Sequence, residues 1–88
     1  MTATLTLPAV LDLQQAGPLR DQLLALRGQS VTIDGSAVER LGGLCLQILI
    51  SAQKTWARDG LSLVIDQVSE PFVQQWEAFG ASDLGETA

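Results

Sequence analysis

The fold of this chain is decided by the stretch Val31-Thr32-Ile33-Asp34-Gly35-Ser36-Ala37-Val38-Glu39-Arg40-Leu41-Gly42-Gly43-Leu44. It begins with a short β-branched run, which favours a buried strand, and the strand ends at Asp34-Gly35, a dipeptide typical of turns. An acidic loop with two glycines follows, and then an apolar helix over 42–58. In α/β domains the loop between a strand and the next helix lies where ligands and partners bind. We therefore expect the site of this protein between residues 34 and 43.

Outward from this stretch, strand and helix patterns alternate along the chain. The expected elements are a strand or hairpin at 4–7 and 9–11 interrupted by Pro8, a helix at 12–27, the strand at 31–33, the helix at 42–58, a strand at 61–65, and a helix from 69 followed by a polar tail from about 81. Each helix then connects two strands by a right-handed crossover. The sequence predicts a single α/β domain over 1–88, with a mixed sheet of about four strands and helices packed mainly on one side.

Composition excludes several classes of function. The chain has 88 residues, a net charge of −5 and no cluster of lysine or arginine, which argues against a nucleic-acid partner. It has one cysteine and no histidine, so we expect no metal site, no cofactor and no enzymatic activity. No segment is typical of a signal peptide or a membrane span. We expect a soluble, cytoplasmic protein that does not insert into a membrane.

The motif Asp34-x-Ser36-x-Val38, followed by Gly43-Leu44 and an aliphatic helix, resembles the signature of STAS domains, the fold of the anti-sigma-factor antagonists. Further stretches lie where that family has equivalents: Leu11-Asp12, Asp59-Gly60-Leu61-Ser62-Leu63 and Phe79-Gly80-Ala81-Ser82-Asp83-Leu84. The resemblance covers nearly the whole chain. It implies a STAS-like fold and a short, stand-alone member of the family.

In the antagonist branch of that family, a phosphorylatable Ser or Thr stands just before the helix. The resemblance places Leu41 at this acceptor position, between Arg40 and Gly42-Gly43. Leucine has no oxygen that could accept a phosphoryl group, so we expect no phosphorylation there. Ser36 is the nearest hydroxyl and the remaining candidate. The alternative is a purely structural loop, in which Ser36 bonds to local backbone and the glycines let the helix begin close to the sheet.

The long helix offers a second candidate surface. Spacing of 100° per residue places Leu41, Cys45, Ile48, Leu49, Ala52 and Trp56 toward the sheet. Leu46, Ile50 and Ala57 then face outward, which favours a docking face, although coverage by the last helix or a homodimer would explain the same stripe. We interpret Cys45, Trp56, Trp76 and Phe79 as core residues. The predicted partner-binding surface comprises Ser36, Glu39, Arg40, Leu41, Gly42, Gly43, Leu46, Gln47, Ile50 and Lys54.

The resemblance implies a non-catalytic protein–protein interaction module in bacterial signal transduction. We expect a chemotaxis or two-component accessory protein, with a histidine kinase or a response regulator as partner. Two other settings of the family stay open: the cytoplasmic STAS subunit of a lipid-transport ABC complex, bound to its ABC ATPase, and an anti-sigma factor antagonist, bound to a kinase-like anti-sigma factor. A small-ligand sensor, for a nucleotide or a lipid, is the alternative from another class.

Overall fold

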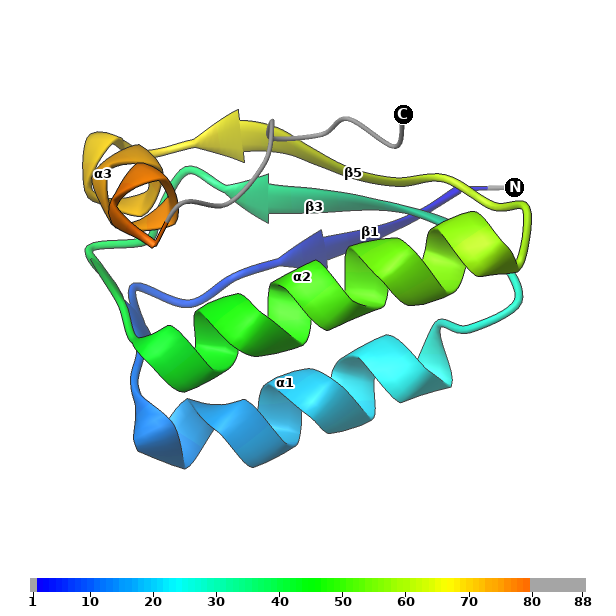
Figure 1. The fold of residues 1–88 in the computed structure, drawn as a ribbon, viewed down its shortest axis with the longest axis horizontal. Helices are drawn as coiled ribbons and strands as arrows, with labels where there is room; N and C mark the ends of the chain where they lie inside the picture. The colour runs from blue at the N-terminus through cyan, green and yellow to red at the C-terminus, as the bar shows by residue number, and fades with distance from the viewer. Residues whose placement is uncertain (1, 80–88) are drawn as a thin grey trace.

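The computed structural model describes residues 2–79, which form five strands and three helices (Figure 1). In chain order these are β1 (Thr2–Thr6), β2 (Val10–Leu11), α1 (Leu13–Ala25), β3 (Ser30–Gly35), β4 (Arg40–Leu41), α2 (Gly43–Arg58), β5 (Leu63–Val68) and α3 (Glu70–Ala78). The predicted polar tail and the stretch from Gly80 to Leu84 lie outside the described residues.

The strands pair in two parallel sheets. The larger has the order β1-β3-β5, with Leu5 opposite Ile33 and Ile33 opposite Ile65, and its register shifts after Ile33. The smaller is the two-residue pair of β2 and β4. Every pairing within residues 2–79 is parallel, so the expected mixed sheet is wrong in this part of the chain, and the residues on either side of Pro8 form no hairpin. The reason is that a helix separates each pair of neighbouring strands and returns the chain to the same edge.

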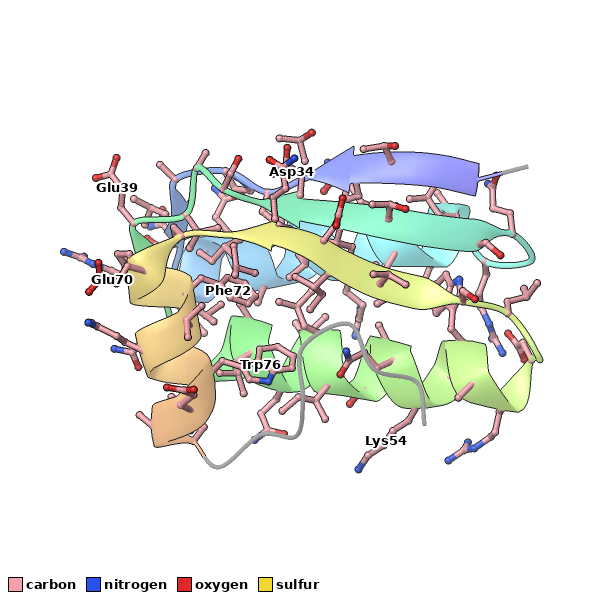
Figure 2. The ribbon with its side chains drawn as sticks, turned by 90° about the horizontal axis from the view of Figure 1, so that it is seen from above. Asp34, Glu39, Lys54, Glu70, Phe72 and Trp76 are labelled. Atoms are coloured by element: carbon pink, nitrogen blue, oxygen red, sulfur yellow. The ribbon has the colours of Figure 1, made fainter. Side chains whose placement is uncertain are left out.

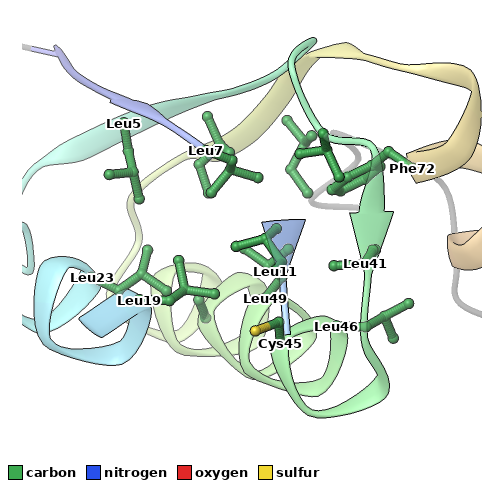
Figure 3. Packing of buried hydrophobic residues seen from close by; sticks show 14 of the residues in the cluster. Leu5, Leu7, Leu11, Leu19, Leu23, Leu41, Cys45, Leu46, Leu49 and Phe72 are labelled. Carbon is green, nitrogen blue, oxygen red and sulfur yellow. The ribbon is translucent and has the colours of Figure 1, made fainter. Parts of the chain in front are cut away.

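Helices α1 and α2 lie side by side on one face of the larger sheet, while α3 lies across the carboxyl ends of the strands (Figure 1). Residues in β3 alternate between buried and half-buried, so that Val31 and Ile33 face the helices. The core formed between the sheet and the helices contains only apolar side chains (Figure 3). The prediction that helices pack mainly on one side is therefore confirmed.

The predicted helix starts are confirmed by their capping bonds. Asp12 precedes α1, and its Oδ1 accepts a hydrogen bond from the backbone N–H of Gln14 at 3.1 Å. Ser69 precedes α3 and its hydroxyl oxygen accepts from the N–H of Phe72 at 3.2 Å. The rings of Phe72 and Trp76 then stack with centroids 5.6 Å apart in the core. Phe79, by contrast, is 52% exposed, because it lies at the end of α3, so its assignment to the core is wrong.

Candidate functional site

The loop after β3 begins with a turn built on Asp34. The Oδ1 atom of Asp34 accepts a hydrogen bond from the backbone N–H of Ser36 at 2.9 Å, and the N–H of Val38 donates to the carbonyl of Gly35 at 3.2 Å. The backbone N–H and then the hydroxyl of Ser36 lower the pKa of the Asp34 carboxyl, because both bonds favour its charged form. Ser36 is therefore a local structural partner of Asp34, although its bonds run to the Asp34 carboxyl and not, as the structural alternative expects, from its side chain to the backbone.

The second half of the loop is held against residues 9–11. The carbonyl of Ala9 accepts hydrogen bonds from the N–H of Glu39 at 2.7 Å and from the N–H of Arg40 at 3.1 Å. The N–H of Gly42 donates to the carbonyl of Leu11 at 2.8 Å. Together with the pairing of β2 and β4, these bonds fix the backbone from Glu39 to Gly42.

The start of α3 holds the middle of the loop. The hydroxyl of Ser69 donates a hydrogen bond to the carbonyl of Val38, and the backbone N–H of Ser69 donates to the carbonyl of Gly35 at 3.2 Å. The Val38 side chain is buried beneath the loop. The loop is thus bonded to two other segments and by its own turn, and it presents its side chains from a fixed backbone.

The two glycines at the start of α2 lie in closely packed surroundings. A Cβ atom on Gly42 would lie 3.1 Å from the carbonyl oxygen of Leu11, and one on Gly43 would lie 3.3 Å from Cζ of Phe79. Both distances are shorter than ordinary van der Waals contacts. The Gly42-Gly43 pair therefore lets α2 begin against residues 9–12 and the end of α3.

The predicted partner-binding residues divide by exposure. Ser36, Glu39, Arg40, Gln47 and Lys54 are exposed, and Gly42 and Gly43 are half-buried. Leu41 and Leu46 are only 3% and 0% exposed (Figure 3). Ile50 is partly buried against the core and Ala57 is exposed, so the expected outward-facing stripe is wrong at Leu46 and Ile50. The physical reason is that Leu46 belongs to the same buried cluster as Phe72 and Trp76 of α3, so that α2 buries a wider face than a single helical stripe.

Burial adds a second reason against phosphorylation at Leu41. Leu41 lies in β4 with its side chain in the core, where no kinase could reach a residue. The accessible positions at the start of α2 are Gly42, Gly43 and Leu44. None of these three residues has a side-chain hydroxyl either.

Lys54 is distant from the other exposed residues of the predicted surface. It follows Gly43 by eleven residues, which corresponds to about 16 Å along the axis of α2. Figure 2 shows Glu39 and Glu70 together at one end of the molecule, with Lys54 well away from both. The structure therefore does not bring Lys54 together with the loop.

The sequence pattern missed three exposed apolar residues near the loop. Val10, Leu13 and Leu44 are 40%, 75% and 50% exposed. Val10 pairs with Arg40 across β2 and β4, and Leu13 and Leu44 begin α1 and α2. Helical spacing alone could have predicted that Leu44 is exposed, because it lies outside the buried stripe of Cys45, Leu49 and Ala52. We define the loop surface as Val10, Ser36, Glu39, Arg40, Leu44 and Gln47.

Cys45 lies below this surface. Its side chain is 1% exposed, and its Sγ donates a hydrogen bond to the carbonyl of Asp12 at 3.3 Å. Burial, and to a lesser extent the charge of Asp12, raises the pKa of the thiol. The thiol is therefore protonated at neutral pH and a poor nucleophile, in agreement with its prediction as a core residue.

Residues 2–79 contain neither a group of side chains suited to a metal ion nor a helix suited to crossing a membrane. No three His, Cys, Asp or Glu side chains gather in this part of the chain into a group that could hold a metal ion. None of α1, α2 and α3 combines the length and the apolar character that a membrane crossing requires.

Comparison with known proteins gives one match. A family model described as "Mlab, STAS domain" matches residues 1–86, which is nearly the whole chain. Neither the curated proteins nor the solved structures include a match. The three helices and parallel strands agree with a STAS-like fold. The chain therefore belongs to the STAS domain family, and this membership implies a non-catalytic role in protein interaction or regulation.

Proposed function

We propose that this protein docks on a partner protein through the loop surface, as a non-catalytic module of a bacterial signal-transduction complex. The observation that carries the proposal is the fixed backbone of the loop between Gly35 and Gly42. Hydrogen bonds to Ala9, Leu11 and Ser69 hold it before any partner arrives. A preorganised surface binds without the entropic cost of ordering a loop.

The side chains on this backbone have the composition of a small interface. Val10 and Leu44 supply exposed apolar area, and Glu39 and Arg40 supply adjacent charges of opposite sign. Apolar contacts contribute most of the affinity in such interfaces, while charges determine which partner is accepted. A partner with a complementary pair of charges around an apolar centre would fit the loop surface.

The setting that we propose is a chemotaxis or two-component pathway. The residues at the start of α2 have no hydroxyl, which disfavours an anti-sigma factor antagonist that is switched by phosphorylation at that point. A loop fixed by backbone bonds agrees with an accessory protein that binds its partner constitutively. The expected partner is a histidine kinase or a response regulator.

Affinity co-purification from the native cell tests both parts of the proposal. The tagged wild-type chain should retain a histidine kinase or a response regulator, and Arg40→Glu should lose most of it. Arg58→Glu is the matched control, because it makes the same charge change at an exposed position at the other end of α2. Retention of an ABC ATPase instead would overturn the signalling setting. Equal retention by wild type and Arg40→Glu, or no partner at all, would overturn docking through the loop surface.

A further inference from the structure

Strand β1 lies at one edge of the larger sheet, and its outer side is unpaired within residues 2–79. The strand order is β1-β3-β5, so β1 bonds to β3 on one side only (Figure 2). The N–H of Leu7 donates to the carbonyl of Asp34 in β3 at 2.9 Å. Successive residues of a strand direct their backbone groups to opposite sides, so the odd residues of β1 bond to β3 and the even residues point away from it. The N–H and C=O groups of Thr2, Thr4 and Thr6 therefore face the free edge.

The other edge of the sheet, β5, is protected against a further strand. The register of β3 and β5 shifts after Ile33, which is opposite Ile65, because the next residue of β3 is opposite Gln67. Asp66 is therefore an extra residue in β5, and its side chain is exposed. A bulge that distorts the edge and a charge placed beside it both prevent unwanted pairing at the edges of sheets.

Strand β1 has neither a bulge nor a charge. Residues 2–7 contain no charged side chain and no proline, and residues 2–6 pair with β3 in continuous register. Thr4 and Thr6 are exposed, and Ala3 packs against the core without being fully buried. Threonine also has a high strand propensity. An unprotected, uncharged edge with free backbone groups is the kind of surface to which an extended segment adds as a further strand.

We propose that β1 binds an extended segment of a partner protein, which adds a fourth, antiparallel strand to the sheet. The segment exchanges backbone hydrogen bonds with Thr4 and Thr6. Its residues alternate, with polar side chains beside the threonines and β-branched apolar side chains on the helix side, next to Ala3 and Leu5. The central residues of the segment are uncharged, because β1 has no charge to pair with them. This edge is separate from the loop surface, so the inference does not rest on the proposed function.

A second copy of this chain is the competing occupant of the edge. Its own β1 alternates threonine with apolar residues, but each copy has a net charge of −5. Antiparallel pairing would also place the helices of both copies on the same side of one continuous sheet. Repulsion between two acidic domains therefore favours an isolated extended segment of another protein over a second copy.

Three synthetic peptides of about ten residues test the proposal. All three alternate threonine with valine and end in the same lysines for solubility; one is unmodified, one is N-methylated at its threonines and one at its valines. Residues opposite each other in an antiparallel pair lie on the same face, so the peptide threonines lie opposite Thr4 and Thr6 and form the hydrogen bonds. N-methylation of the threonines removes those N–H groups, whereas N-methylation of the valines removes only N–H groups that point away from β1.

Fluorescence anisotropy measures the three affinities. We expect the unmodified and the valine-methylated peptides to agree within about threefold, and the threonine-methylated peptide to bind at least about tenfold more weakly. Binding of the unmodified peptide should also slow hydrogen exchange at the amides of Thr4 and Thr6 and leave the amides of β5 unchanged.

Two variants of one residue assign the binding to β1. Thr4→Pro removes the outward N–H, and proline is tolerated at an edge where that group faces solvent. Thr4→Val keeps both the N–H and the β-branched shape. Thr4→Pro should weaken the unmodified peptide at least about tenfold, and Thr4→Val should change its affinity less than about twofold. Urea midpoints report whether both variants fold, and the exchange measurement on the wild type tests the site without any variant.

Several results would overturn the inference. The three peptides could bind equally, the valine-methylated peptide could be the weak one, or protection could fall on β5 or on the loop surface. A dimer in sedimentation analysis that Thr4→Pro dissociates would assign the edge to a second copy. Arg40→Glu separates this test from that of the proposed function: it should abolish co-purification of the partner and leave the peptide affinities unchanged, so that either proposal can fail without the other.

Discussion

Leu44 and Leu46 are two positions apart in α2, and their environments are opposite. Leu44 is 50% exposed, and Leu46 is 0% exposed within the core cluster. A substitution at Leu44 therefore reports on binding, while one at Leu46 reports on folding. A charged residue at position 46 would test stability rather than docking, because it would bury an unpaired charge.

The first prediction follows from this difference. Leu46→Ala should lower the free energy of unfolding by about 2–5 kcal/mol, because it removes buried methyl groups and leaves a cavity. Leu44→Ala should change it by less than about 1 kcal/mol. Urea denaturation followed by circular dichroism measures both. Similar small losses for the two variants would mean that Leu46 faces solvent after all.

The second prediction concerns the Asp34 carboxyl. Its pKa is lowered in the folded protein by the bonds from Ser36, so its charged form stabilises the fold above the ordinary pKa of about 3.9. This stabilisation should be lost as pH falls through the lowered folded pKa. The stability difference between wild type and Asp34→Asn should thus be constant above about pH 5 and change only in acid.

Two measurements check this prediction. NMR titration of the Asp34 carboxyl should give a pKa below the ordinary value, and Ser36→Ala should raise it part of the way back, since the backbone bond from residue 36 is kept. Urea midpoints between pH 3 and 7 should follow the same curve. An ordinary pKa in the wild type would contradict the turn that begins the loop.

At the scale of elements, Ser69 connects α3 to the loop. Its hydroxyl caps α3 by accepting from Phe72 and also donates to the carbonyl of Val38. The third prediction is that Ser69→Ala costs about 1–2 kcal/mol of stability, since it removes the cap and one of the bonds that hold the loop. It should also raise the hydrogen-exchange rates of the amides from Gly35 to Arg40.

Ser62→Ala is the control for this variant, because Ser62 is exposed and lies just before β5. It should change stability by less than about 0.5 kcal/mol and leave exchange in the loop unaltered. If Ser69→Ala loosened α3 alone, with no change in the loop, the fixed backbone of the loop surface would not depend on Ser69.

At the scale of the whole molecule, Cys45 reports on global unfolding. Its thiol is buried in a core that sheet and helices share, and its pKa is raised. The fourth prediction is that a disulfide reagent labels Cys45 only through opening of the fold, so that the labelling rate rises with urea in parallel with unfolding. Leu46→Ala should accelerate labelling. Rapid labelling of the native wild type would show that the core at the start of α2 is accessible.

Local sequence signals predicted most of the elements of this protein and the loop in which we propose its site. The β-branched run before Asp34-Gly35 predicted β3, and the helix starts predicted at residues 12 and 69 are where Asp12 and Ser69 cap α1 and α3, since these signals act between residues close in the chain. A signal of the same local kind, the turn dipeptide Asp34-Gly35, located the loop between β3 and α2. The resemblance to STAS domains rested on motifs of this local kind as well, and the family match confirmed it.

Only the tertiary structure decided which side chains are accessible at that site. Helical periodicity assigns one buried stripe to α2, but the core cluster around α2 also includes Phe72 and Trp76 of α3, and Phe79 at the end of α3 lies against Gly43. The second contact joins segments more than thirty residues apart, Gly43 and Phe79, and no local pattern contains it. Leu46 is buried in the core cluster, whereas Leu44, two residues earlier in α2, remains half exposed. Burial depends on all the neighbours of a helix, and those neighbours are known only when the chain is folded.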